Sequence, residues 1–525
     1  MEAAPAFGFR RVSDRLGWWN LYFVAKLALF ALGLIGFHLV ENLVFAVLLG
    51  FMAAPRARQF RPWIGVPVAI ALLYYDSYLP GLARVISQAG LVAGFSGAYL
   101  VELAGRFVSM KALAVLAAAV AACIVVARFV RLDVFVVLAM LVLPFVFGKP
   151  APPVPGATVA ATAKGATAPA GPDAMLADFF RKEATRSVAF AKPPDGSPDF
   201  DVVFLHVCSL SWDDLAAIGM DKHPLLASFD ILFRRFNSVS TYSGPAAIRF
   251  LRAPCGQSSH KGLYAQAAAQ CLLMPDLQQA GFQTQLILNH DGHFDGFLKI
   301  VRDQGVHAPP QSLKGIDAPM RAFDGSRIYD DGAILARWLE SRGNEPAART
   351  AVYYNTLSLH DGNTLQSNPK PKSSETYKAR VGRLLDDIQG FIERLAAIGR
   401  RAVVVLVPEH GAAWRGDAAQ IAGLREIPTP AITLVPVGVR VIGPDARRVG
   451  DAVQVSEPAS FLALSEIVSR MLAKPPYSGD GFRATDYAAN LPLTDYVSEG
   501  SDVTILARGA GFVICQDQDA WKELR

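Results

Sequence analysis

Apolar segments in the first 150 residues constrain the fold of this chain more than any other feature of its sequence. The longest of them can cross about 30 Å of hydrocarbon as a helix. Overall, 52% of the residues are hydrophobic and only 18% are charged, an unusual balance for a wholly soluble chain. We therefore predict a multi-span α-helical membrane domain over residues 1–148, with about five helices. The segments are Trp18–Val40, Leu43–Ala54, Trp63–Leu79, Leu113–Val130 and Leu132–Phe147.

Arginine residues flank alternate apolar segments and predict their orientation. Because basic residues concentrate in cytoplasmic loops, everything after Phe147, and the loop Gly81–Ser109, would face the outer side. Lys26 lies within the first segment near its cytoplasmic end, and we expect its amino group to reach the interface. A cleaved signal peptide followed by core helices is the alternative, but signal segments are shorter and further spans follow here. The arginines are Arg10, Arg11, Arg15, Arg56, Arg58, Arg61, Arg128 and Arg131.

A linker rich in Pro, Ala, Gly and Thr follows over residues 149–189. Its first part, "KPAPPVPGATVAATAKGATAPAGPD", has no hydrophobic periodicity. Such composition is typical of an extended, semi-flexible tether.

The remainder, residues 190–525, alternates short apolar runs rich in β-branched residues with longer amphipathic stretches. This pattern predicts an α/β domain with a largely parallel central sheet flanked by helices. In such sheets, functional sites form where the strands end in loops at their carboxyl edge. The apolar runs are residues 201–207, 284–289, 351–359, 402–408 and 431–437.

Side chains with ligand or nucleophile chemistry follow several of these predicted strands. Cys208 follows the first run, His360 follows the third, and Glu409 and His410 follow the fourth. Ser243 stands where a helix can begin, in "TYSGPAAIR". Thiolate, imidazole and carboxylate are the groups that bind zinc in tetrahedral sites. Their coincidence at one sheet edge predicts a metal site beside a nucleophile.

Each residue also has a plainer explanation by itself. A lone cysteine after a strand is usually a small buried hydrophobe, as Cys208 would then be. Ser243 can be a helix cap with Pro245 in the first turn. The second run is followed by His290 and His293, whose roles the pattern leaves open, as it does the binding of a second metal.

Six motifs together resemble the bacterial cellulose phosphoethanolamine transferases, the G subunits of bacterial cellulose synthesis systems. The resemblance spans essentially the whole chain, and "CSLSWDD" is its most specific part. It implies the alkaline phosphatase superfamily fold for the α/β domain. Most lipid A phosphoethanolamine transferases have a similar layout but place a carboxylate where this family has cysteine. The motifs are "HVCSLSWDD", "YSGPAAIR", "CLLMPDL", "LNHDGHFDGF", "PEHGAA" and "IAGLREIPTP".

Carried over by motif, the resemblance implies a zinc ion held by Cys208, Glu409 and His410. Ser243 would be the nucleophile and the fourth ligand, and His360 the neighbouring acid/base or phosphate-contacting group.

Two further residues near these motifs have two interpretations each. Arg425, in "AGLREIP", is either an anion clamp or a surface arginine. Tyr242, beside the nucleophile, either contacts the phosphate or merely packs.

The resemblance also implies a reaction. Phosphoethanolamine would pass from phosphatidylethanolamine to Ser243, and then to the C6 hydroxyl of glucose units in cellulose. The protein would lie in the bacterial inner membrane with its catalytic domain in the periplasm, beside other cellulose synthase subunits. No Lys/Arg run suggests a nucleic-acid partner.

Other functions remain as alternatives. The first is another superfamily enzyme, such as a phosphoglycerol or lipid A phosphoethanolamine transferase. A sulfatase is disfavoured because "YSGPAAIR" does not match the C/S-x-P-x-R spacing. The second is a non-catalytic membrane scaffold of a polysaccharide synthase.

Five cysteines cannot all pair within one chain. The resemblance supports a disulfide between Cys255 and Cys271, which would leave Cys208 available for zinc. Cys123 lies in the fourth apolar segment, and we expect Cys515, in a β-rich tail, to be a buried thiol.

Overall fold

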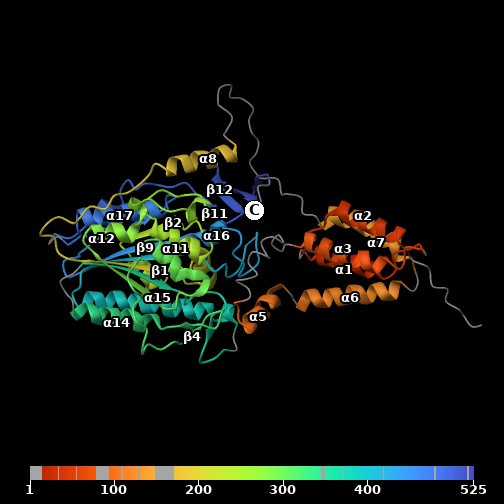
Figure 1. The fold of residues 1–525 in the computed structure, drawn as a ribbon, viewed down its shortest axis with the longest axis horizontal. Coiled ribbons are helices and arrows are strands. Elements are labelled where there is room, and N and C mark those ends of the chain that lie inside the picture. Colours follow the sequence, from red (N-terminus) through yellow and green to blue (C-terminus); the bar gives the residue numbers. More distant parts are fainter. Residues whose placement is uncertain are drawn as a thin grey trace, which may run out of the picture. The chain divides into compact units, whose positions relative to one another are not determined.

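A computed structural model shows two compact units, Met1–Gly94 with Leu100–Ala166, and Phe95–Tyr99 with Thr167–Arg525 (Figure 1). The structure describes residues 15–32, 35–54, 56–77, 94–107, 110–127, 130–147, 171–344, 349–369, 372–417, 419–477, 480–516 and 520–524. Three of the arginines that predict the orientation, Arg10, Arg11 and Arg128, lie outside these ranges, as do linker residues 149–170.

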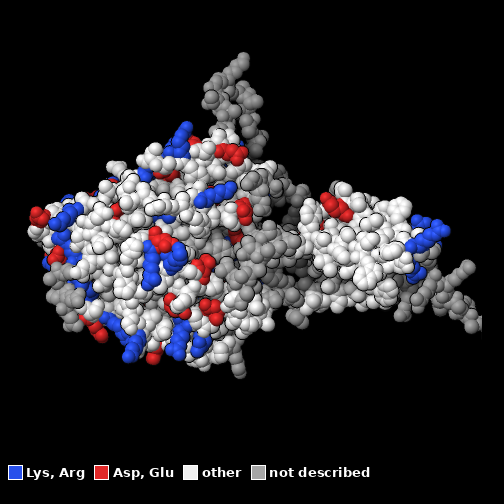
Figure 2. Space-filling view, in the orientation of Figure 1, with Lys and Arg blue, Asp and Glu red and all other residues white. Residues whose placement is uncertain are grey.

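The first unit is helical, and its described helices fall within or near the predicted apolar segments, except that helix α5 (Gly97–Phe107) lies in the stretch predicted as the loop Gly81–Ser109. The first segment is not one helix, because α1 ends at Ala31 and Leu39 begins the next helix. Side chains such as Phe23, Phe45 and Met140 are buried between the helices. The visible face of this unit carries few charged side chains (Figure 2). The helices are α1 (Trp19–Ala31), α2 (Leu39–Phe51), α3 (Arg61–Asp76), α5 (Gly97–Phe107, which begins in the second unit), α6 (Met110–Val126) and α7 (Leu132–Phe147).

Across the residues that the structure describes, none of the helices has both the length and the apolar character that a membrane crossing requires. The multi-span domain therefore stays a prediction.

Lys26 does not extend toward an interface as expected. Its side chain is buried, and its Nζ lies 2.7 Å from Oδ2 of Asp76 on α3. The same Nζ donates to Oδ1 of Asn42 on α2 at 2.8 Å. The expectation is wrong because Asp76, distant in the sequence, supplies a partner in the interior. Removing one member of such a pair leaves an uncompensated buried charge, which typically costs about 3–5 kcal/mol, so the pair holds α1, α2 and α3 together.

The second unit is built around a seven-stranded sheet with the order β10-β2-β9-β8-β1-β6-β3. The sheet is largely parallel, as predicted, but it is mixed, because β9 runs antiparallel to both of its neighbours, β2 and β8. The other neighbouring pairs are parallel. The strands are β1 (Asp201–Val207), β2 (Ile231–Asn237), β3 (Gln283–Leu288), β6 (Thr350–Thr356), β8 (Ala402–Pro408), β9 (Leu434–Ile442) and β10 (Val453–Val455).

The reversal of β9 follows from the connection that precedes it. A parallel neighbour requires a crossover that carries the chain back across the sheet. The described residues between β8 and β9 contain only one short helix, α16 (Pro430–Thr433), which leads directly into β9. The chain therefore turns at the edge where β8 ends and runs back beside it.

Helices cover both faces of the central sheet (Figure 1). Strands β1, β6 and β8 are buried along their whole length, which explains their continuous apolar runs. One face packs against α11 (Ser243–Leu251), α12 (Leu273–Gln279), α13 (Phe297–Asp303) and α17 (Phe461–Ala473). The other packs against α9 (Trp212–Ile218), α10 (Pro224–Ser228), α14 (Asp331–Asn344) and α15 (Ser373–Ala397).

The smaller elements complete the unit. A three-stranded sheet contains β4 (Met320–Arg321), β5 (Arg327–Ile328) and β7 (Thr364–Leu365). A four-stranded antiparallel sheet contains β11 (Val497–Glu499), β12 (Val503–Arg508), β13 (Gly511–Gln516) and β14 (Lys522–Glu523). The remaining helical turns are η1 (Gly262–Tyr264), η2 (Ala269–Cys271), η3 (Phe294–Gly296) and α18 (Ala484–Ala488).

A helix occupies part of the range assigned to the linker. Helix α8 spans Pro172–Glu183, and its Phe179 is buried against Val497 and Val513 of the carboxyl-terminal sheet. Trp521 Nε1 also donates to Oδ1 of Asp173 at 2.8 Å. This apolar contact, made with strands more than 300 positions away, is why local composition did not predict the helix.

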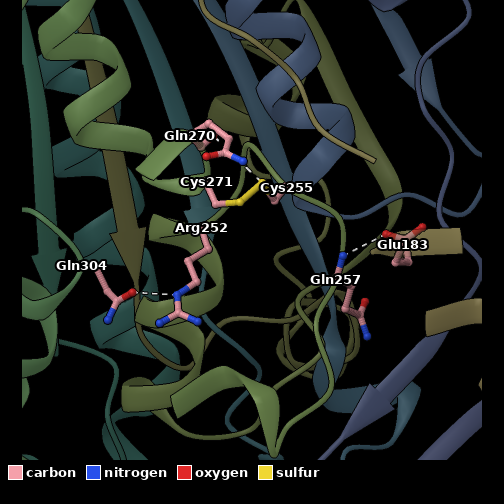
Figure 3. Close-up of a disulfide and its surroundings, with 7 residues drawn as sticks. All are labelled: Glu183, Arg252, Cys255, Gln257, Gln270, Cys271 and Gln304. Atoms are coloured by element: carbon pink, nitrogen blue, oxygen red, sulfur yellow. Dashed lines mark hydrogen bonds between the residues drawn. A yellow bond between two sulfur atoms is a disulfide. The ribbon is translucent and has the colours of Figure 1, made fainter. Parts of the chain in front are cut away.

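A disulfide joins Cys255 and Cys271 beyond the end of α11 (Figure 3). Arg252, three residues earlier, donates from Nε to Oε1 of Gln304 at 2.7 Å. The backbone nitrogen of Gln257 donates to Oε2 of Glu183 at 2.9 Å. The disulfide loop thus connects α11 with α8. Cys515 is only partly buried, contrary to expectation.

We predict that replacing both disulfide cysteines, Cys255→Ser with Cys271→Ser, lowers the free energy of unfolding by about 3 kcal/mol. The cross-link closes a loop of 16 positions and so restricts the unfolded chain. Denaturant unfolding of the purified chain measures the change, with Cys515→Ser as the control. Equal stability of the double variant and the control would contradict the prediction.

Candidate active site

The core of the site lies where β1 and β8 end side by side. These parallel strands pair Val207 with Pro408, so the residues that follow them meet at the same edge. Three of those residues are Cys208, Glu409 and His410, and all three are buried. Their ligand atoms lie within 4.8 Å of one another.

Backbone hydrogen bonds fix these three residues in place. The nitrogen of Glu409 donates to the carbonyl of Val207 at 2.8 Å, and the nitrogen of Leu210 donates to the carbonyl of His410 at 2.7 Å. The Cys208 nitrogen donates to the carbonyl of Thr356, at the end of β6, at 3.0 Å. Sheet pairing therefore continues into the site, and the ligand atoms need little rearrangement to meet.

Ser243 is the first residue of α11, and its Oγ lies 3.6 Å from Sγ of Cys208. Tyr242 occupies the cap position, and no side-chain capping bond is present there. Ser243 is therefore not the helix cap. Arg249 of α11 is buried, donates to Oγ of Ser240 at 2.9 Å, and holds the helix in place.

The spacing of the ligand atoms fits a tetrahedral metal ion. Nε2 of His410 lies 3.9 Å from Sγ of Cys208 and 3.7 Å from Oε2 of Glu409. A tetrahedral zinc ion with bonds of about 2.0–2.3 Å places its ligand atoms about 3.3–3.8 Å apart. Oε2 of Glu409 is buried and has no hydrogen-bond partner among the described residues. These residues could therefore hold zinc.

The electrostatics of the cluster also favour a cation. Burial raises the pKa of the Cys208 thiol to about 12, and the Glu409 carboxylate acts in the same direction. Burial raises the pKa of Glu409 and lowers the pKa of His410 well below its usual range. Burial alone thus keeps the thiol protonated, whereas a bound cation reverses this preference because it stabilises the thiolate and the carboxylate.

Arg425 belongs to the site and is not a surface residue. Its Nη1 donates to Oγ of Ser209 at 3.2 Å, and its Nη2 lies 3.5 Å from Nε2 of His360. Ser209 has a left-handed backbone with φ of 64°, which is uncommon outside glycine. Arg425 therefore brings a permanent positive charge into the site beside Ser209 and His360.

Tyr242 lies on the rim of the site and is 40% exposed. Its ring lies 5.8 Å from the guanidinium carbon of Arg425. Its hydroxyl donates to the carboxylate of Glu426. Tyr242 therefore does more than pack, because it contacts the two residues that follow Leu424 in the "AGLREIP" motif.

His360 is partly buried beside this arginine. Its Nδ1 lies 2.6 Å from the carbonyl oxygen of Asp361, which can only accept, so Nδ1 carries the proton. Nε2 is then unprotonated and available as a base. Burial, and secondly Arg425, lower the pKa of His360 to about 3, so the neutral ring predominates near neutral pH.

Asn355, at the end of β6, was missed by the sequence analysis. Its Nδ2 donates to Oε1 of Glu409 at 2.6 Å. Its Oδ1 accepts from Nε2 of His290 at 2.9 Å, while Nδ1 of His290 accepts from the nitrogen of Gly292 at 3.1 Å. His290 is therefore connected to Glu409 through Asn355. Its position at the end of an apolar strand was the available signal, but an amide is not a usual metal ligand.

Two other histidines clarify the boundary of the site. His206, inside β1, is buried with its Nδ1 3.5 Å from Oε1 of Glu409, and the sequence analysis missed it as well. His293 is 88% exposed and lies near Asp291. The structure thus separates His293 from His290, which share one loop.

Comparison with known proteins identifies the family. Residues 157–521 match the family described as "Cellulose biosynthesis protein BcsG C-terminal domain", and residues 19–145 match "Cellulose biosynthesis protein BcsG N-terminal domain". The BcsG proteins of Escherichia coli strain K12 and Salmonella typhimurium strain LT2 are each 39% identical to this chain. Each alignment covers 94% of this chain and 93% of the relative. The chain belongs to the BcsG family.

This confirms the family resemblance drawn from the sequence motifs. Solved structures similar to this BcsG-family chain include an alkaline phosphatase superfamily protein from Vibrio parahaemolyticus, with 12% identity, coverage of 67% and 91%, and a TM-score of 0.46. Another is the zinc complex of the periplasmic domain of EptC from Escherichia coli, with 15% identity, coverage of 60% and 94%, and a TM-score of 0.43. A third is the soluble domain of lipooligosaccharide phosphoethanolamine transferase A from Neisseria meningitidis, with 14% identity, coverage of 54% and 93%, and a TM-score of 0.40.

We predict that Asn355, which bonds Glu409, and His290, which bonds Asn355, control the metal affinity of this BcsG-family chain. Asn355→Ala is expected to weaken zinc binding about 10- to 100-fold, because it frees the carboxylate from the bond that orients it. His290→Ala should also weaken zinc binding, but by a smaller factor. Competition with a chromophoric chelator measures the affinities. His293→Ala is the matched control, and equal affinities for all three variants would contradict the prediction.

Proposed function

We propose that this chain transfers phosphoethanolamine from phosphatidylethanolamine to the C6 hydroxyl of glucose units in cellulose, with zinc as its metal and Ser243 as the nucleophile. One observation carries the proposal. The hydroxyl of Ser243 lies 3.6 Å from Sγ of Cys208, beside the buried cluster of Cys208, Glu409 and His410. Membership in a family of cellulose biosynthesis proteins supports cellulose as the acceptor.

Cys208, Glu409 and His410 would hold the zinc ion, and Ser243 would stand at the fourth position. When bound, zinc supplies positive charge that lowers the pKa of a nearby hydroxyl. The residues fit this role because sulfur, carboxylate and imidazole ligands all suit zinc.

The first half-reaction forms a bond between Oγ of Ser243 and the phosphorus of the donor lipid. The bond from phosphorus to the glycerol oxygen breaks, and diacylglycerol leaves. The serine loses one proton and the leaving oxygen gains one, so the step is balanced. The amino-terminal end of α11 adds backbone N–H groups and the positive end of the helix dipole, which favour the negative phosphate oxygens.

The second half-reaction transfers the group to the sugar. The oxygen of a glucose hydroxyl forms a bond to the phosphorus and loses its proton, while the bond from phosphorus to Oγ of Ser243 breaks and the serine oxygen regains a proton. His360 suits the proton transfers of both steps, because its Nε2 is unprotonated and can accept a proton and release it again. Arg425, held by Ser209, is placed to neutralise the phosphate oxygens.

The chain organisation proposed for this reaction follows the apolar segments and the arginine distribution. Residues 1–148 would span the inner membrane, residues 149–170 would form a tether, and the α/β domain would lie in the periplasm. A lipid donor and an extracellular polysaccharide could then both reach the site. Other cellulose synthase subunits are the proposed neighbours.

We predict that Ser243→Ala lowers group transfer by at least about 1,000-fold, because it removes the oxygen that would attack the phosphorus. The full chain is assayed in vesicles of phosphatidylethanolamine with soluble cello-oligosaccharides. Mass spectrometry of the Ser243 peptide, from wild-type chain incubated without acceptor, should show a phosphoethanolamine adduct.

The matched control is Ser501→Ala, which changes an exposed serine between β11 and β12. It should retain full transfer. Wild-type rates for Ser243→Ala would sink the enzymatic proposal and favour a scaffold. Transfer of glycerol phosphate from phosphatidylglycerol, in place of phosphoethanolamine, would favour the phosphoglycerol alternative.

A further inference from the structure

The segment Phe95–Tyr99 belongs to the same compact unit as the α/β domain, although it precedes that domain by about 100 residues. The backbone nitrogen of Ser96 donates to the carbonyl of Phe323 at 2.8 Å. The nitrogen of Tyr99 donates to Oγ of Ser96 at 3.3 Å, so the start of α5 is capped by this serine. The segment is therefore fixed by polar bonds as well as by packing.

Aromatic rings connect this segment with His360. The ring of Phe95 lies 5.5 Å from the ring of Phe323, and Phe323 in turn lies 4.4 Å from the imidazole of His360. Phe294 adds an edge-to-face contact to Phe323 at 4.5 Å. Cys208 borders the same apolar cluster. The wall of the site beside His360 is thus partly built from Phe95 and its neighbours.

A hydrogen bond adds a polar connection to the same place. The hydroxyl of Tyr99 donates to Oδ2 of Asp361 at 2.9 Å, across 262 positions of sequence. The carbonyl of Asp361 accepts from Nδ1 of His360 at 2.6 Å. Asp361 therefore accepts a hydrogen bond from Tyr99 with its side chain and one from His360 with its backbone carbonyl.

The turn after His360 contains a glycine that leaves room for the ring of Tyr99. Gly362 has φ of 81°, a left-handed value that favours glycine. A Cβ at this position would lie 2.8 Å from the ring of Tyr99 and 2.6 Å from Cβ of Phe323. A larger residue at 362 would push the tyrosine away from Asp361.

We propose that Tyr99 is a positioning residue of the active site, which holds Asp361 and through it sets the orientation of the His360 imidazole. The segment Phe95–Tyr99 thereby completes a site whose other residues come from the α/β domain. The kinetic part of this proposal rests on the function proposed above, because His360 is assigned to proton transfer there.

Tyr99→Phe in the full chain tests the proposal, because it keeps the ring against Phe323 and Gly362 and removes only the hydroxyl. A lost hydrogen bond to a charged group predicts a fall in kcat of about 10-fold. KM for the lipid donor should stay within about twofold, since a positioning role gives Tyr99 no direct contact with the lipid. Tyr264→Phe, at an exposed tyrosine, is the control and should leave both constants unchanged.

A double-mutant cycle shows whether Tyr99 acts through Asp361. If it does, adding Tyr99→Phe to Asp361→Ala should produce no further loss of kcat. Multiplied losses in the double variant, a rise in KM alone, or a wild-type kcat for Tyr99→Phe would each overturn the proposal.

A spectroscopic readout separates this proposal from the proposed function. In chain labelled with 15N at histidine, the His360 ring signal should move in Tyr99→Phe and stay in place in Tyr264→Phe. The His360 signal is assigned by its loss in His360→Gln. An unmoved signal overturns the positioning role even in a chain that transfers nothing, whereas a moved signal supports it there.

Discussion

The parallel pairing of β1 with β8 is the constraint on which the rest of the site depends. In this register, Cys208 follows Val207 on one strand, and Glu409 and His410 follow Pro408 on the other. Three donor atoms that burial would each keep uncharged are thereby held within reach of one ion. A cation offsets the cost of burying a thiolate beside a carboxylate, and the hydroxyl of Ser243 lies next to the place it would occupy.

The antiparallel direction of β9 has a functional consequence. Because the chain does not cross the sheet after β8, the described residues between β8 and β9 stay near the carboxyl edge. Arg425 lies in this connection. Because the connection stays at this edge, Arg425 is close enough to contact Ser209 and His360. The same connection places Glu426 against Tyr242. The mixed sheet and the anion-binding side of the site therefore have one cause.

Much of the site could be predicted because its chemistry is local in sequence. Continuous apolar runs marked the buried strands, and the residues directly after them carried recognisable ligand types, as Cys208, Glu409 and His410 do. The direction of β9 could not be predicted, because the run 431–437 looks the same in a parallel or an antiparallel neighbour. His290 and His293 have the same chemistry, and only the fold shows that one is buried against Asn355 and the other exposed.

Contacts between distant parts of the chain were the main source of error. Lys26 is buried because Asp76 meets it, and α8 forms where an apolar strand surface is available to cover Phe179. The bond from Tyr99 to Asp361 joins two segments that no local pattern relates. In each case the residue's position depends on a contact with a residue that is distant in the sequence.

X-ray absorption at the zinc edge of the purified full chain shows whether Cys208 belongs to a zinc site. We expect one tightly bound zinc per chain, with a single sulfur neighbour at about 2.3 Å and nitrogen or oxygen neighbours at about 2.0–2.2 Å. The sulfur contribution should vanish in Cys208→Ser. A chain that retains no zinc after equilibration and desalting, or a zinc shell without sulfur in the unaltered protein, would rule out this zinc site.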